Sequence, residues 1–158
     1  MAEFRIELRL LREGDEGVLS NVDPDVFDNP VDPRWTAEFF ADPRHHIIVA
    51  LDGDLVVGMC TSFHYVHPDK PPQMFINELG VAGSHRRRGI GRFLVEAMLA
   101  HARTLGCTEA WLGTEEDNVP ARRLYEGVIA PGEKFYLYEL DFSKTVPPEK
   151  QKERITTE

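Results

Sequence analysis

The chain has 158 residues, 42% of them hydrophobic and 28% charged, which is the composition of an ordinary globular domain. Its 27 acidic against 18 basic residues give a formal net charge of −9. That balance disfavours a nucleic-acid partner and suits a cationic substrate. No apolar run reaches membrane-spanning length and no basic-then-apolar leader is seen, so we expect a cytoplasmic protein without a membrane partner. Cys60 and Cys107 lack metal-like spacing, and we expect reduced thiols and no metal site.

The first half of the chain predicts strands and short helices. Alternating apolar residues indicate a half-buried strand over 4–11. The following residues to 32 are rich in Asp, Gly and Pro, with a short helix near 15–19, and a second short helix is predicted over 33–40. Strands over 46–51 and 55–66 are joined by Asp52-Gly53, a strong hairpin signal.

The most informative stretch is 74–92. Its apolar residues predict a strand over 74–81, which Ala82, Gly83 and Ser84 end. From Ile90 onward, apolar residues recur at helical spacing until Gly106. A helix N-terminus carries about half a positive charge and unpaired N–H groups. The same junction holds four arginines, which predict an anion-binding site: Arg86, Arg87, Arg88 and Arg92.

Two common phosphate loops do not fit this junction. A Walker loop needs Lys followed by Ser or Thr after its glycines, and neither follows here. A dinucleotide fingerprint needs a third glycine, and position 94 is Leu94.

The pattern Arg86-x-x-Gly89-x-Gly91 after a strand resembles the pyrophosphate loop of the GNAT N-acetyltransferases, which bind acetyl-coenzyme A. Farther along, Ala-Trp-Leu at 110–112 is similar to the family's next strand. The segment Asn118-x-x-Ala-x-x-Leu-Tyr125-Glu is similar to its next helix. The stretch 78–91 is most like the small aminoglycoside 3-N-acetyltransferases. The resemblance covers roughly residues 45–142.

This resemblance implies an α/β (α+β) fold. A central mixed, mostly antiparallel sheet of about six to seven strands would be flanked by about four helices and splayed between strands four and five. We expect one domain over 1–142, ending in a strand over 134–142, and a polar disordered tail over 143–158. Gly-Val-Ile-Ala at 127–130 departs from the family pattern and leaves the register of the last strands open.

The resemblance also implies a cosubstrate site. The backbone of 79–81 would pair with the pantetheine arm, and Gly80 suits a bulge or a close backbone approach. Gly89 and Gly91 would let amides approach the pyrophosphate, whose charge the arginines neutralise. The residues expected to bind acetyl-coenzyme A are Leu79, Gly80, Val81, Arg86, Arg87, Arg88, Gly89, Ile90, Gly91, Arg92, Asn118 and Tyr125.

For catalysis, Tyr125 matches the family's general acid, and Glu78 is the best candidate for a general base acting through a water. Acidic residues in 23–32 and at Glu115, Glu116 and Asp117, with Glu78 between them, predict an amine-binding site; the same runs also fit solvated loops. The implied acceptor is a small polycationic amine, with an aminoglycoside leading. Three other acceptors stay open: another small amine, a polyamine or a peptide N-terminus. A non-catalytic acyl-coenzyme A sensor is the alternative function, and a homodimer is possible.

Overall fold

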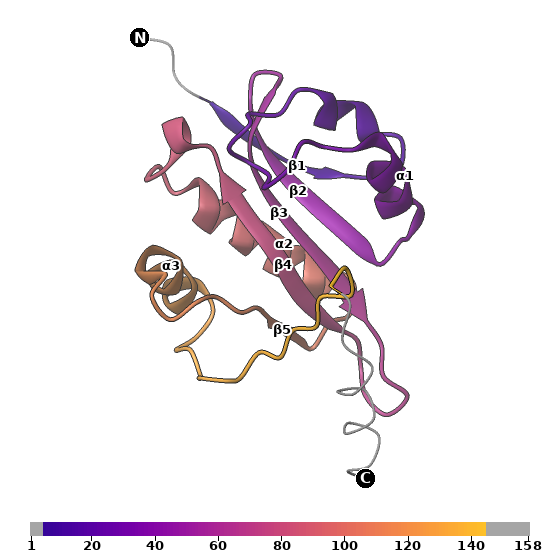
Figure 1. The fold of residues 1–158 in the computed structure, drawn as a ribbon, viewed down its shortest axis with the longest axis vertical. Helices are drawn as coiled ribbons and strands as arrows, with labels where there is room; N and C mark the ends of the chain where they lie inside the picture. The colour runs from indigo at the N-terminus through magenta and orange to yellow at the C-terminus, as the bar shows by residue number, and fades with distance from the viewer. Residues whose placement is uncertain (1–4, 145–158) are drawn as a thin grey trace.

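A single five-stranded sheet forms the centre of the molecule, for which a computed structural model describes residues 5–144 (Figure 1). Neighbouring strands are antiparallel except the last pair, which is parallel. In spatial order the strands are β1 (Ile6–Leu11), β2 (His45–Asp52), β3 (Leu55–Tyr65), β4 (Gln73–Val81) and β5 (Glu109–Trp111).

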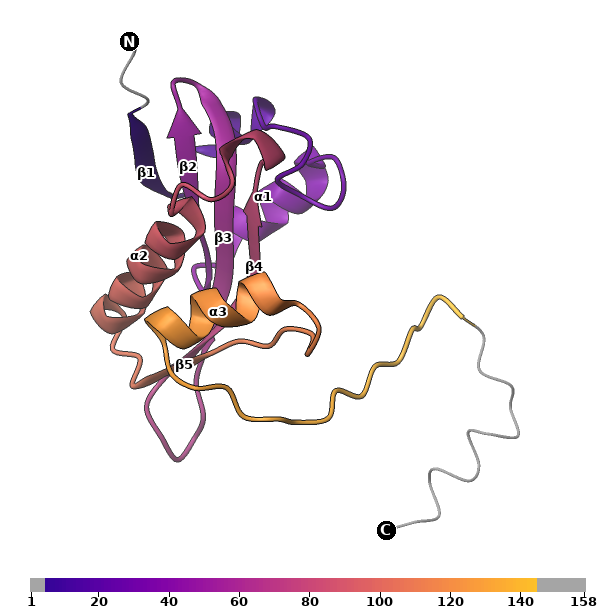
Figure 2. The same cartoon turned by 90° about the vertical axis from the view of Figure 1, so that its left-hand side faces the viewer.

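Three α-helices and two 3₁₀ turns accompany the sheet in residues 5–144: η1 (Glu16–Ser20), α1 (Pro33–Ala41), η2 (Gly83–His85), α2 (Ile90–Thr104) and α3 (Val119–Val128). α1 begins at Asp32, whose carboxylate accepts the Arg34 N–H at 2.8 Å. α3 begins at Asn118, whose side chain accepts the Ala121 N–H at 3.3 Å. α1 lies on the opposite side of the sheet from α2 (Figure 2).

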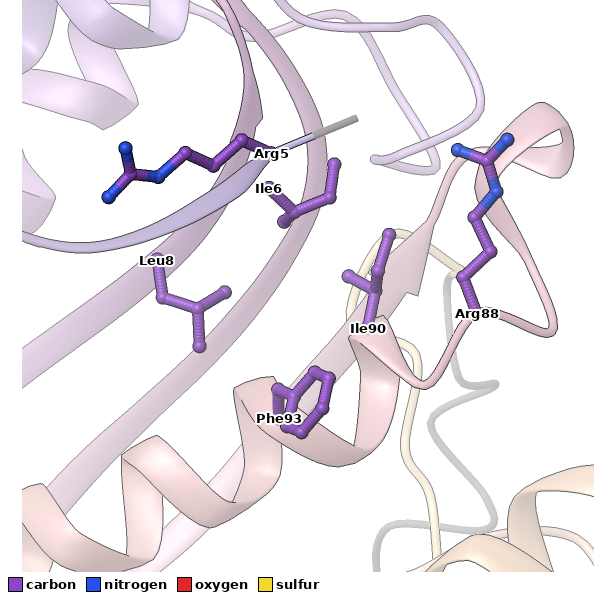
Figure 3. A pocket seen from close by; sticks show the side chains of 6 residues that line it. All are labelled: Arg5, Ile6, Leu8, Arg88, Ile90 and Phe93. Carbon is purple, nitrogen blue, oxygen red and sulfur yellow. The ribbon is translucent and has the colours of Figure 1, made fainter. Parts of the chain in front are cut away.

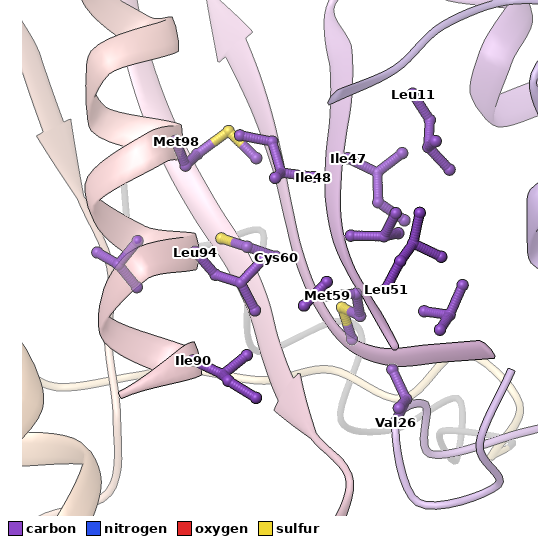
Figure 4. Packing of buried hydrophobic residues seen from close by; sticks show 14 of the residues in the cluster. Leu11, Val26, Ile47, Ile48, Leu51, Met59, Cys60, Ile90, Leu94 and Met98 are labelled. Atoms are coloured by element: carbon purple, nitrogen blue, oxygen red, sulfur yellow. The ribbon is translucent and has the colours of Figure 1, made fainter. Parts of the chain in front are cut away.

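Apolar side chains fill both sides of β2 and β3 (Figure 4). Leu94 and Met98 of α2 are fully buried on one side, where Cys60 of β3 also lies. Gly58 lets the helix approach, because a Cβ there would lie 3.1 Å from Leu94 Cδ1. Burying each large apolar side chain stabilises the fold by about 1.5–3 kcal/mol, so these contacts hold α2 against β3.

The predicted splay between strands four and five is confirmed. β5 pairs with β4 only from Gln73 to Phe75, while β4 continues to Val81. The Ala82 N–H donates to the Val57 carbonyl at 2.8 Å, on the β3 side. Because ladder bonds alternate along an antiparallel pair, the backbone groups of Leu79 and Val81 point to the other edge, which β5 does not cover.

The expected numbers of elements were too high. The described residues contain five strands instead of about six to seven, and three α-helices instead of about four. Phe4 of the predicted first strand and the part of the predicted tail from residue 145 lie outside the described residues.

The strand predicted over 134–142 is wrong, because this segment pairs with no strand among the described residues. Lys134 forms an ion pair with Glu116, and the Phe135 ring lies against Gly113. Both contacts lie beyond Trp111, where β5 ends, and the segment then runs away from the sheet (Figure 2). Its large apolar side chains are consequently exposed: Phe135, Tyr136, Leu137, Tyr138, Leu140 and Phe142.

Candidate active site

The loop between β4 and α2 presents the predicted anion-binding groups. Arg86, Arg87 and Arg88 are exposed on it. Arg87 (φ 61°) and Gly89 (φ 79°) both adopt left-handed backbone conformations, which is uncommon for a residue with a Cβ. Gly89 is the N-cap of α2 and supplies no side-chain cap, so the first amides of a 15-residue helix stay available to an anion.

The arginines differ in their local contacts. Arg86 Nε donates to the Val81 carbonyl at 3.1 Å, at the open edge of β4. Arg92 Nε donates to Glu96 Oε1 at 2.8 Å along the helix surface. Thus Arg86 bridges the loop and the unpaired strand edge, while Arg92 is held along α2.

Gly91 and Ile90 serve packing as well as the loop. A Cβ on Gly91 would lie 3.1 Å from Leu124 Cδ1 and 3.6 Å from Leu79 Cδ2. The glycine therefore lets β4, α2 and α3 meet at one point. The Ile90 side chain is buried, which leaves its backbone N–H as the group facing the loop.

Gly80 marks a close approach of two chain segments and is not the site of a bulge. A Cβ on Gly80 would collide with the Val26 carbonyl, so the loop carrying Val26 crosses β4 there. The sequence left a bulge and a close backbone approach open for Gly80, and the structure shows the close approach. The Asp-rich segment 23–32, called the acidic loop below, therefore lies over the face of β4 that points away from α2.

The aspartates of this loop divide into structural and site-facing residues. Asp23 accepts the Asp25 N–H at 3.0 Å, Asp25 accepts the Gly83 N–H at 3.3 Å, and Asp32 caps α1. Asp28 instead lies close enough to Glu78 for its carboxylate to act on it. The Glu78 side chain reaches solvent but is partly covered by neighbouring atoms. This partial burial is the main cause that raises the pKa of Glu78, and the negative charge of Asp28 is the second.

Tyr125 is half-buried on α3 and packs against the core. Burial is the main cause that raises the pKa of Tyr125, and the nearby Cys60 thiol and Glu115 carboxylate raise it further. The phenol is thus kept protonated and able to donate. Asn118, the other cosubstrate residue expected from α3, already uses its side-chain oxygen to cap the helix.

The acidic run 115–117 is also divided. Glu116 binds Lys134 at 2.6 Å, and its carbonyl accepts from Arg122 Nη1 at 3.1 Å, so it anchors the loop before α3. Glu115 lies close enough to Tyr125 to affect its pKa. Asp117 is exposed.

Thr61 and Asn77 were missed by the sequence reasoning. Thr61 is the Cα partner of Glu78, whereas the adjacent Ser62 pairs with Ile76, so Asn77 is an extra residue in β4, a β-bulge. The Thr61 hydroxyl is buried without a hydrogen-bond partner in residues 5–144. No local signal marks either residue, because Thr is an ordinary strand former and only the register reveals the bulge.

A separate hollow of about 440 Å³ lies between β1 and the start of α2 (Figure 3). It is lined by Arg5, Ile6, Leu8, Arg88, Ile90 and Phe93. Neither Glu78 nor Tyr125 belongs to its lining, so it is distinct from the predicted catalytic pair.

Residues 5–144 contain neither a membrane-spanning helix nor a metal cluster. None of the helices in this range is both long and apolar enough to cross a membrane. Within the same range, no group of three or more His, Cys, Asp or Glu is arranged to hold a metal ion.

The fold and the loop define the class of protein. The chain belongs to the Acetyltransferase (GNAT) family, whose sequence model matches residues 17–127. A mycothiol acetyltransferase of Thermomonospora curvata is 32% identical over 131 residues, which cover 77% of this chain and 40% of the relative. A streptothricin acetyltransferase of Streptomyces lavendulae is 33% identical over 85 residues, which cover 54% of this chain and 43% of the relative. The matches therefore span about two fifths of the length of each relative.

Among solved structures, an aminoglycoside N-acetyltransferase in complex with coenzyme A superimposes with a TM-score of 0.71. The match covers 87% of this chain and 95% of the other, at 15% sequence identity. At 15% identity this similarity shows that the two proteins share a fold, and no more.

Proposed function

We propose that this chain transfers an acetyl group from acetyl-coenzyme A to the primary amine of a small cationic acceptor, with an aminoglycoside as the leading candidate. One observation carries the proposal. The unpaired edge of β4 runs directly into an arginine-bearing loop and the start of α2, which has no side-chain cap. Glu78 lies on β4, and Tyr125 lies on α3, whose Leu124 meets Leu79 of β4 at Gly91.

The cosubstrate would be held by backbone as much as by side chains. Acetyl-coenzyme A supplies the acetyl group as a thioester. The amides at the start of α2, with Arg86, Arg87 and Arg88, would bind its pyrophosphate. The outward-facing backbone of Leu79 and Val81 would pair with its amide-bearing arm as an added strand would. The Val81 carbonyl is now bonded to Arg86, which can turn to a phosphate instead.

The protein would then move two protons. Glu78 accepts the proton of the acceptor's ammonium group through a water, and its raised pKa makes it a stronger base than an ordinary glutamate. The amine nitrogen bonds to the carbonyl carbon while the carbon–sulfur bond breaks, and the nitrogen releases its second proton to solvent as the neutral amide forms. Tyr125 gives its proton to the departing sulfur and is reprotonated from solvent. A backbone N–H at the open edge of β4 would stabilise the developing oxyanion.

The acceptor's positive charge is supported by the carboxylates around this site. Asp28 and Glu78 lie together on one side, and Glu115 lies near Tyr125. The protein as a whole carries a formal charge of −9. Carboxylates gathered at a cleft attract a cationic substrate and raise its local concentration.

A thiol-release assay over an amine panel tests the proposal. The panel contains an aminoglycoside, a polyamine, an amino-acid amide, a peptide with a free N-terminus and a neutral aryl amine. We expect coenzyme A release with a cationic small amine and an acceptor KM that rises with salt, because the Debye length falls to about 8 Å at physiological ionic strength. Coenzyme A binding by calorimetry without turnover of any amine would instead indicate a sensor.

A further inference from the structure

We propose that Phe63, Phe75 and Trp111 form a stacking surface for the acceptor, so that the preferred substrate is a cationic amine that carries a ring. These three residues are called the aromatic platform below. The inference rests on the proposed function and narrows its substrate class. A ring, whether sugar or aromatic, offers a flat face to such a surface, whereas a linear polyamine does not.

The platform rings are in mutual contact. The Phe75 and Trp111 ring centroids lie 4.4 Å apart, and those of Phe63 and Phe75 lie 5.4 Å apart. The Trp111 side chain is 47% exposed, and both phenylalanines are partly exposed. Three strands, β3, β4 and β5, thus place one aromatic ring each on a continuous accessible surface.

Hydrogen bonds fix the orientation of this surface. The Trp111 indole N–H donates to the Tyr65 hydroxyl at 2.6 Å, and that hydroxyl donates to Gln73 Oε1 at 3.1 Å. The Gln73 amide donates to Glu109 Oε2 at 2.6 Å. An exposed indole held in this way loses little conformational entropy when a ligand stacks on it, which favours binding.

The bulge at Asn77 places the platform on the same face as Glu78. Phe75 pairs with Phe63 and Glu78 pairs with Thr61, so all four side chains share one side of the sheet. Without the extra residue, positions 75 and 78 would face opposite sides, because side chains alternate along a strand. Glu78 lies three residues beyond Phe75 along the strand, a distance of about 10 Å.

Ser62 identifies which face this is. Its hydroxyl donates to Met98 Sδ of α2 at 3.0 Å, so the alternate residues Thr61 and Phe63 face away from α2. On that face, α1 reaches the border of the platform. Phe39 stacks on His45 at 5.2 Å, and His45 meets the edge of Phe63 at 6.4 Å.

The groups beside the platform indicate what occupies it. The carboxylates of Glu78 and Asp28 supply negative charge at one end, where an ammonium group would lie. The Thr61 hydroxyl, buried and without a partner in residues 5–144, lies beside Glu78 and can bond a ligand or a water there. Acid at one end and rings at the other match an amine attached to a ring by a short spacer.

The two tryptophans of the chain make a direct binding test possible. Trp35→Phe leaves Trp111 as the sole indole. We expect kanamycin or 2-phenylethylamine to change the emission of Trp111 in this variant, and spermidine to leave it unchanged. This readout does not depend on turnover, so it tests the platform even if the proposed acetyl transfer fails.

Kinetics then test the contribution of the platform. Trp111→Ala should raise KM for the ring-bearing amine about tenfold while leaving KM for spermidine unchanged, and Trp111→Phe should retain most of the effect. Trp35→Ala is the matched control, because Trp35 is 57% exposed on α1 and lies outside the platform. An unchanged ratio of the two KM values in folded Trp111→Ala would overturn the inference. So would Trp111 emission that neither ring-bearing amine alters at saturation.

Discussion

Thr61 on β3 lies directly opposite Glu78 on β4, although the next residue along β3, Ser62, lies opposite Ile76. The single extra residue between them turns the Glu78 carboxylate to the face that carries the acidic loop and the aromatic rings. A strand without that bulge would direct this carboxylate toward α2 and the core.

Glu78→Gln should lower kcat by about 10²–10⁴-fold, since the amide cannot accept a proton. Burial and Asp28 raise the pKa of Glu78, so the wild-type rate should fall on the acid side at a higher pH than an ordinary glutamate would cause. A pH–rate profile checks both points. Glu7→Gln, an exposed position on β1, is the control and should behave as wild type.

Tyr125→Phe should lower kcat far more than it changes coenzyme A affinity, because the hydroxyl's proton is needed only when the thiolate departs. Burial raises the pKa of Tyr125, so any loss of rate from its ionisation should occur at a higher pH than for a free phenol. Stopped-assay kinetics and calorimetry on the same preparation separate the two effects. A variant that turns over at the wild-type rate across pH would show that Tyr125 is not the general acid and serves only in packing.

Arg86→Ala with Arg88→Ala should weaken coenzyme A binding by about 1.5–3 kcal/mol for each charge-assisted hydrogen bond to the phosphates that the variant can no longer form. The affinity of the wild type should also fall with salt more steeply than that of the double variant. Arg103→Ala, in the last turn of α2 and thus at its other end, is the matched control. Equal calorimetric affinities for the wild type and a folded double variant would show that Arg86 and Arg88 do not bind coenzyme A.

His46 makes stability depend on pH. Its Nε2 lies 2.8 Å from His64 Nδ1, and its Nδ1 lies 3.0 Å from His101 Nε2. Burial and then the neighbouring histidines lower the pKa of His46 to about 4, below the usual value of about 6.5 in an unfolded chain. The unfolded chain therefore binds more protons between these values, and stability should be lost as pH falls from 6.5 through 4.

Urea denaturation at several pH values between about 7.5 and about 4.5 measures this loss. His46→Gln removes the titrating group, so its unfolding midpoint should fall less over the same range. Parallel midpoints for the two proteins across the range would assign the acid sensitivity to other groups.

The exposed segment 134–142 should promote self-association, because an unpaired chain segment with many exposed apolar side chains is a template for pairing. Six large apolar residues are exposed along it. Tyr136→Lys with Tyr138→Lys should shift sedimentation equilibrium toward monomer without lowering Tm, since both side chains lie outside the core. A wild-type chain that stays monomeric at high concentration would contradict this expectation.

Features encoded by neighbouring residues could be predicted from the sequence. Asp32 and Asn118 begin helices as cap chemistry requires, and the Asp52-Gly53 turn joins β2 to β3. The strand, arginine loop and helix around Gly89 follow one another directly in the chain. Periodicity and turn preference act over a few residues, so a single sequence contains the information needed to place these elements.

Strand register and the meeting of distant segments were decided only by the tertiary structure. The bulge at Asn77, the crossing of Val26 over Gly80 and the contact of Trp111 with Phe75 all depend on partners far along the chain. The segment 134–142 was predicted as a strand but pairs with none among residues 5–144, since the outermost strand β5 is only three residues long and ends at Trp111. A side-chain pattern specifies which faces can be buried, whereas the partner that buries them is fixed by packing of the whole chain.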